Sequence, residues 1–176
     1  MNYIYIAQSL DGFIATADGG IEWLEAVPNP EGSDFGYSEF ISKIDALLMG
    51  RNTFEKVLSF GEWSYTIPVY VLSNTLTTIP EELEGKVFLI NGKLEDVISQ
   101  LSSKGMNNLY IDGGQVISSF LKEDLIDEMI ITTVPVLLGS GLSLFGDTGA
   151  MKNFSHLSTE VLNDHLVKSH YVRNKT

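Results

Sequence analysis

Four consecutive residues, Gly50, Arg51, Asn52 and Thr53, are suited to binding an anion at the start of a helix. They follow an apolar run of the kind found in strands buried on both faces. Gly50 allows a tight turn, and Asn52 is a candidate helix cap that Glu55 could reach back to. Because the N–H groups at a helix N-terminus carry partial positive charge, Arg51 and Thr53 would complete a phosphate site. The alternative is an ordinary strand-to-helix turn with a solvated arginine.

Two further strand ends carry groups of the same kind. Ser73 and Asn74 follow the apolar strand predicted at residues 67–72, and Gly113 and Gly114 lie between a predicted strand and a predicted helix. Ligands of open α/β sheets bind beyond the carboxyl ends of the strands, and paired glycines let the backbone approach a pyrophosphate. Each segment alone could be a simple turn. Their recurrence after three buried strands predicts a dinucleotide site.

The elements that must position these residues follow from the spacing of apolar side chains. The predicted strands are residues 1–10, 13–15, 46–49, 67–72, 86–90, 108–111, 128–138, 154–161 and 166–173, and the predicted helices are 22–26, 35–44, 53–59, 94–104 and 115–121. This order predicts an α/β fold, with a mixed, mostly parallel sheet, helices on both faces and a C-terminal antiparallel hairpin. The length favours a single domain, residues 1–176. The loop at residues 18–36 is long enough to be functional or mobile.

Composition excludes several classes of function. Acidic residues outnumber basic ones by 23 to 11, and the resulting net charge of −12 disfavours nucleic acid and anionic membranes as partners. Cysteine is absent, which excludes disulfides and thiolate metal sites and fits a cytoplasmic protein. No export leader or membrane span is expected. Because His156, His165 and His170 lack the spacing of metal ligands, no metal is predicted.

The chain resembles the dihydrofolate reductase fold, and within it the C-terminal reductase domain of riboflavin-biosynthesis enzymes, a branch that includes stand-alone bacterial members. The matching segments are spread over nearly the whole length: residues 9–15, 45–55, 68–74, 112–114, 134–141 and 144–145. The resemblance implies an NADPH-dependent oxidoreductase. Its activity would be that of 5-amino-6-(5-phosphoribosylamino)uracil reductase or of dihydrofolate reductase.

The resemblance also implies which residues bind NADPH. Ala7 would line the nicotinamide side, and Ser73 and Asn74 would contact the adenine ribose and its 2′-phosphate. The adenosine phosphate region would be held by Gly50, Arg51, Asn52 and Thr53, and the pyrophosphate by Gly113, Gly114, Gln115 and Val116. The peptide between Asp112 and Gly113 is a candidate cis bond. Since a carboxylate would repel the pyrophosphate, the Asp112 side chain is expected to turn away or to cap a neighbouring N–H.

Hydride transfer needs an acid, or a water held by one, to neutralise the charge that builds on the acceptor. Asp34 lies 16 positions before Gly50 (50 − 34), the interval at which dihydrofolate reductases carry their acid, so the resemblance implies that Asp34 is catalytic. Asp34 could equally cap the following helix. Glu39 and Tyr37 are alternatives on that helix.

Aromatic residues offer walls for a flat heterocycle. The candidates for substrate binding are Tyr37 and Trp63, with Trp23 and Phe35, and the resemblance adds Thr132 as a pterin-binding position. The predicted substrate is a pteridine or a ribosylaminopyrimidine, although no second basic cluster is evident for a phosphoribityl tail. The alternative function is a non-catalytic or sensory NADP-binding module. Homodimers are common in this branch, and residues 129–138 are a candidate shared surface.

Overall fold

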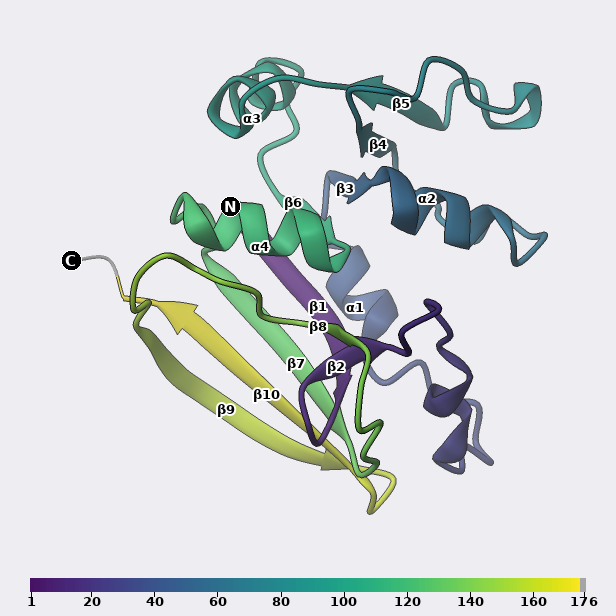
Figure 1. Cartoon of the computed structure of the whole chain (residues 1–176), viewed down its shortest axis with the longest axis vertical. Helices are drawn as coiled ribbons and strands as arrows, with labels where there is room; N and C mark the ends of the chain where they lie inside the picture. The colour runs from purple at the N-terminus through teal and green to yellow at the C-terminus, as the bar shows by residue number, and fades with distance from the viewer. Residues whose placement is uncertain (175–176) are drawn as a thin grey trace.

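An eight-stranded sheet forms the centre of the computed structural model, which describes residues 1–174 (Figure 1). Its strand order is β5-β4-β3-β6-β1-β7-β10-β9. In chain order the strands are β1 (Asn2–Ser9), β3 (Ala46–Gly50), β4 (Val69–Leu72), β5 (Val87–Ile90), β6 (Leu109–Asp112), β7 (Glu128–Val134), β9 (Phe154–Leu162) and β10 (Leu166–Arg173). All neighbours are parallel except that β10 runs antiparallel to β7 and β9. The mostly parallel mixed sheet and the C-terminal hairpin are therefore confirmed.

Helices cover both faces of the sheet, as predicted. One hydrophobic cluster contains the apolar residues of α3 (Leu94–Ser103) and α4 (Gly114–Lys122), and the other contains those of α1 (Tyr37–Ile41) and α2 (Arg51–Leu58). Strand β3 shows why both faces are covered, since Ala46 and Leu48 belong to the first cluster while Leu47 and Met49 belong to the second. Because neighbouring side chains of a strand point to opposite faces, an unbroken apolar strand needs cover on both.

The remaining elements connect the main layers. A small second sheet pairs β2 (Phe13–Ala15) with β8 (Leu142–Ser143). Two short 3-10 helices are η1 (Glu22–Ala26) and η2 (Glu81–Leu83), and η1 coincides with the turn predicted inside the long loop. In Figure 1 this loop lies beside α1, on the same side of the molecule as the ends of β1 and β2.

The capping prediction for α2 is wrong. The helix begins at Arg51 rather than at Thr53, so Asn52 lies inside the first turn and makes no cap. Glu55 accepts a hydrogen bond from Arg51 Nε at 2.6 Å instead of reaching back to the helix start. An arginine four residues before a glutamate forms an ion pair on the helix surface, and this pair replaces the capping box.

The prediction of a cis bond between Asp112 and Gly113 is also wrong, because no peptide bond in residues 1–174 is cis. The tight path after β6 is achieved by Gly113 itself, whose φ of 89° and ψ of 129° lie in a region that side chains other than glycine rarely adopt.

Strand β7 ends at Val134, four residues before the predicted end. It is an interior strand, paired with β1 on one side and with β10 on the other. The segment suggested as a dimer surface therefore offers no free strand edge over residues 129–134, and a homodimer stays a prediction.

Candidate active site

Two helices begin at the same edge of the sheet, directly after neighbouring parallel strands. Helix α2 follows β3, helix α4 follows β6, and β3 pairs with β6. The residue before each helix is a glycine, Gly50 or Gly113, which has no side chain to cap the first N–H groups. Neither first turn contains an acidic residue, whereas that of α3 contains Glu95 and Asp96. The two N-termini are thus suited to a phosphate.

Close packing at this edge explains why glycine is needed there. A Cβ on Gly113 would overlap Thr53 Oγ1, and a Cβ on Gly50 would lie 3.1 Å from Val116 Cγ2. A Cβ on Gly114 would approach Ile14 Cδ1 to 3.2 Å. The structure therefore brings together Gly50, Thr53, Gly113, Gly114 and Val116, which the sequence places in two distant segments.

Arg51 and Ser73 meet at the ends of β3 and β4 through a residue that the sequence analysis missed. The Arg51 Nη1 group donates to Thr75 Oγ1 at 3.1 Å, and Ser73 Oγ accepts hydrogen bonds from the N–H groups of Thr75 and Leu76 at 3.2 and 3.0 Å. Asn74 lies exposed between them. The signal for Thr75 was the polar run that continues past Asn74.

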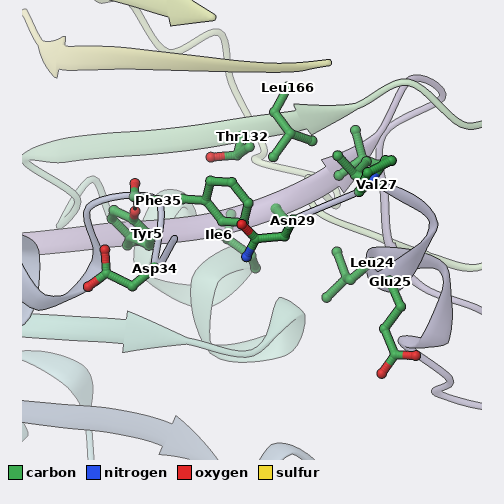
Figure 2. A pocket seen from close by; sticks show the side chains of 13 residues that line it. Tyr5, Ile6, Leu24, Glu25, Val27, Asn29, Asp34, Phe35, Thr132 and Leu166 are labelled. Atoms are coloured by element: carbon green, nitrogen blue, oxygen red, sulfur yellow. Dashed lines mark hydrogen bonds between the residues drawn. The ribbon is translucent and has the colours of Figure 1, made fainter. Parts of the chain in front are cut away.

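A cavity of about 540 Å³ lies on the side of the sheet covered by α1 (Figure 2). Ala7 and Thr132 are directly paired neighbours on β1 and β7 and both line it. The other lining residues are Tyr5, Ile6, Leu24, Glu25, Val27, Pro28, Asn29, Asp34, Phe35, Val134 and Leu166. A volume in this range suits a small-molecule ligand, and most of the lining is apolar.

Asp34 lies on the cavity wall just before α1, and its carboxylate accepts main-chain N–H groups around the start of that helix. Its Oδ1 accepts the Gly36 N–H at 2.9 Å and its Oδ2 accepts the Ser38 N–H at 2.9 Å. The Ser38 hydroxyl, and then these N–H groups, lower the pKa of Asp34 to about 2. The N-cap residue of α1 is Gly36 rather than Asp34, but the Asp34 carboxylate still satisfies a first-turn N–H of the helix, and it is ionised at neutral pH. A catalytic role for Asp34 stays a prediction.

Phe35 places an aromatic ring in the cavity, between Tyr5, Asn29 and Thr132 in Figure 2. Its φ of 55° is unusual for a residue with a side chain. Two groups hold its carbonyl, because Tyr5 Oη donates to it at 2.9 Å and Lys168 Nζ donates to it at 3.0 Å. The ring is therefore positioned by strands β1 and β10.

Asp112 is a second carboxyl near this face of the sheet. It pairs with Met49 at the end of β6, and alternation along the strands places it on the face that carries Tyr5 and Ala7. Its Oδ1 accepts the Gly113 N–H at 2.8 Å, so the predicted capping of a neighbouring N–H is confirmed. Burial raises the pKa of Asp112 to about 6, and the Gly113 N–H opposes that rise only in part.

Two of the four aromatic residues predicted to form walls, Tyr37 and Trp63, pack against other aromatic side chains. Tyr37 packs edge-on against Tyr5, with ring centres 6.0 Å apart. Trp63 packs against Phe54 and Tyr65, and its buried Nε1 has no hydrogen-bond partner. Neither lines the cavity, although Thr132 does.

Gln115 occupies the first turn of α4 with Val116.

Residues 1–174 contain neither a membrane-spanning helix nor a cluster of metal-ligating side chains. No helix in this part of the chain is long and apolar enough to cross a membrane. Within the same residues, no group of three or more histidine, aspartate or glutamate side chains has the arrangement of a metal site. His170 instead pairs with Glu128 at 2.8 Å, and His156 contacts the Thr159 hydroxyl.

Comparison with known proteins identifies the family. The chain is 36% identical to the uncharacterised protein YwjB of Bacillus subtilis, over 97% of this chain and 96% of that protein. A crystal structure of a candidate riboflavin biosynthesis protein from Shewanella sp. PV-4 is 50% identical and superposes with a TM-score of 0.96 over 99% of both chains. Dihydrofolate reductase from Enterococcus faecalis, solved with NADP(H), has a TM-score of 0.69 at 16% identity over 99% of this chain and 97% of that one, which shows a common fold. The family model of the RibD C-terminal domain matches residues 3–168, and this chain therefore belongs to the RibD C-terminal domain family.

Proposed function

We propose that this chain is an NADPH-dependent reductase that transfers a hydride to a small planar heterocycle. One observation carries the proposal: the cavity lined by Ala7 and Thr132 lies at the carboxyl end of the sheet, where two helices begin with uncapped N–H groups. A dinucleotide needs such an arrangement, since its phosphates bind at helix N-termini while its reactive ring reaches the substrate.

The groups available for NADPH are divided along this edge. The N-termini of α2 and α4, with Thr53, would hold the phosphates, and Gln115 and Val116 would lie beneath the pyrophosphate. Arg51, Ser73 and Thr75 would hold the 2′-phosphate, because a guanidinium and two hydroxyls are strong donors to a phosphate group. Ala7 would border the nicotinamide, which supplies the hydride when the cofactor is bound.

The cavity suits a flat heterocycle of the pteridine or ribosylaminopyrimidine type. Phe35 and Tyr5 offer aromatic faces and Val27 and Leu166 offer apolar contacts, so a ring would be desolvated inside. Thr132 adds a hydroxyl that can donate or accept a hydrogen bond. The Asp34 carboxylate would accept from an amino group of the substrate.

The proton that neutralises the reduced substrate needs a separate source. Asp34 has no proton to give at neutral pH, because its pKa is about 2. Asp112, with a pKa of about 6, is partly protonated under mildly acidic conditions. Since it does not line the cavity, it is our candidate for the acid acting through an intervening water. A carboxyl whose pKa is raised by burial is a frequent feature of such sites.

A second function, a non-catalytic or sensory NADP-binding module, is favoured by one feature. The two oxygens of Asp34 are engaged by the N–H groups of Gly36, just before α1, and of Ser38 in its first turn, so the predicted acid already has a structural task. Such a module would bind NADPH without oxidising it.

Two measurements test the proposal. NADPH fluorescence titration of the wild type, Arg51→Ala and the matched control Lys56→Ala should show a loss of affinity of roughly tenfold to a hundredfold for Arg51→Ala only. Lys56 is a suitable control because it is on the same helix and contacts Phe60 instead. Equal affinities for all three proteins would contradict the phosphate assignment.

The second measurement separates the two functions. Loss of the nicotinamide absorbance is followed with a panel of pterins, dihydrofolate and ribosylaminopyrimidines. Oxidation with one member supports the reductase. Binding of NADPH without oxidation by any of them supports the module.

A further inference from the structure

We propose that the cavity selects a substrate with amino groups on its reacting heterocycle and no phosphate on an attached ribose. The cavity would discriminate against the 5′-phosphate of the same compound. This inference rests on the proposed reductase function and narrows its substrate class. It departs from the phosphoribityl compounds that the family resemblance implies.

The charges on the cavity wall are of one sign. Glu25 and Asp34 are the charged residues that line it, and the rest of the lining is neutral. Figure 2 shows these two carboxylates on opposite sides of the cavity, with Phe35 and Asn29 between them. Asp34 is held as an anion by the Ser38 hydroxyl and by the N–H groups of Ser38 and Gly36. A phosphate on the substrate would therefore enter between two negative groups.

Within residues 1–174, no lysine, arginine or histidine lines the cavity, so no basic side chain on its wall offsets the negative charge. Lys168 comes near, on β10 beside Thr132, but its ammonium is already bound. It forms an ion pair with Glu160 at 2.5 Å and donates to the Phe35 carbonyl at 3.0 Å. Arg51 does not line the cavity, and the proposed function already assigns it to the 2′-phosphate of NADPH.

The same groups favour an amino heterocycle. Asp34 accepts two backbone hydrogen bonds and the Ser38 hydroxyl, and a carboxylate can accept about four donors in total, so one position remains open. An amino group of the heterocycle can donate to that position. The Asn29 side chain also lines the cavity, and its amide is paired with the Ser33 main chain at 2.8 and 2.9 Å, which leaves one N–H to donate to a ring carbonyl.

The test compares a ribosylaminopyrimidine with its 5′-phosphate, so that the two compounds differ in the phosphate alone. With NADPH as reductant, we expect kcat/KM to be at least about tenfold higher for the phosphate-free compound at low salt. The ratio should shrink as salt is added, because screening weakens repulsion between charges.

A pair of variants assigns the effect to the cavity. Glu25→Lys should lower the ratio severalfold by placing a cation on the wall. Glu31→Lys makes the same charge change in the same loop at an exposed residue that does not line the cavity, and it should leave the ratio unchanged. Equal or faster turnover of the phosphorylated compound by the wild type would overturn the inference, and so would equal shifts in the two variants.

Failure of the reductase function is distinguishable from failure of this inference. If neither compound oxidises NADPH, the same preference is measured by quenching of tryptophan fluorescence, since Trp23 adjoins Leu24 of the cavity wall. Tighter binding of the phosphate-free compound then supports charge selection while the reductase proposal fails. Tighter binding of the phosphorylated compound, or binding of neither, contradicts the inference.

Discussion

The side-chain ammonium of Lys168 donates a hydrogen bond of 3.0 Å to the main-chain carbonyl of Phe35, 133 residues away in sequence. The same carbonyl accepts the Tyr5 hydroxyl at 2.9 Å, so both of its lone pairs are used. Phe35 and Gly36 have φ values of 55° and 91°, and this left-handed pair leads into α1. The two donors therefore stabilise a backbone shape that places the Phe35 ring in the cavity.

Replacing Lys168 by methionine should loosen this arrangement. The variant keeps most of the apolar stem but loses the bond to Phe35 and the pair with Glu160, so we expect unfolding to become easier by about 1–2 kcal/mol. KM for the substrate should rise more than kcat falls, because the ring forms part of the wall. Urea denaturation and steady-state kinetics provide the two measurements. Lys43→Met removes the exposed pair with Glu39 and should cost less than about 0.5 kcal/mol. Equal effects in the two variants would argue against a positioning role for Lys168.

Asp34→Asn tests the cap and the acid separately. The folded protein holds the Asp34 pKa at about 2, below the ordinary value of 3.8, so the carboxylate stabilises the fold above pH 4 and loses this effect as pH falls through 2. Thermal midpoints of wild type and variant should therefore differ at neutral pH and converge near pH 2. Turnover that is unchanged at neutral pH would remove Asp34 from the list of catalytic groups.

Asp112→Asn tests a pH dependence of stability that is opposite in sign to that of Asp34. Burial raises the Asp112 pKa to about 6, so the folded state holds a proton that the unfolded chain loses near pH 4. Stability of the wild type should then fall as pH rises from about 4 to 6, by roughly 1–3 kcal/mol, and the variant should lack this fall. Urea denaturation at several pH values measures it. The exposed Asp147, 4.0 Å from Lys122, supplies the control Asp147→Asn, which should keep the wild-type profile.

The same variant tests the proton source. If Asp112 donates the proton, kcat of the wild type should decline above pH 6, and Asp112→Asn should lower kcat without this decline. A variant with the wild-type kcat and pH profile would exclude Asp112 from the reaction.

Gly113→Ala probes the meeting point of α2 and α4. The added Cβ would overlap Thr53 Oγ1 and would also force a positive φ, so we expect a cost of about 2 kcal/mol or more and weaker NADPH binding. Gly105→Ala isolates the backbone contribution, because Gly105 has a φ of 84° with open space around it. That control should cost about 1 kcal/mol and leave NADPH affinity unchanged. Similar stabilities for the two variants would mean that the contact with Thr53 relaxes freely.

The local pattern of apolar and turn residues was sufficient to predict the architecture. Unbroken apolar runs in β3 and β6, the 3,4 spacing of the helices and the glycines after the strands indicate which segments are strands, where they stop and which faces need cover. The three polar strand ends were visible for the same reason, because a parallel sheet must place them at one edge. Boundaries shifted by a few residues where side chains found other partners, as Glu55 did with Arg51.

Tertiary structure alone decided the roles of individual groups at the site. Thr75 meets Arg51, and Lys168 meets Phe35, only because strands distant in sequence are paired in a particular register. The two carboxyls show the same dependence, since the Ser38 hydroxyl and nearby N–H groups lower the pKa of Asp34 whereas burial raises that of Asp112. The local sequence determines strands, helices and turns, because these depend on residues a few positions apart. The charge state of a carboxyl and the residues that line the cavity depend on neighbours that folding brings from far along the chain.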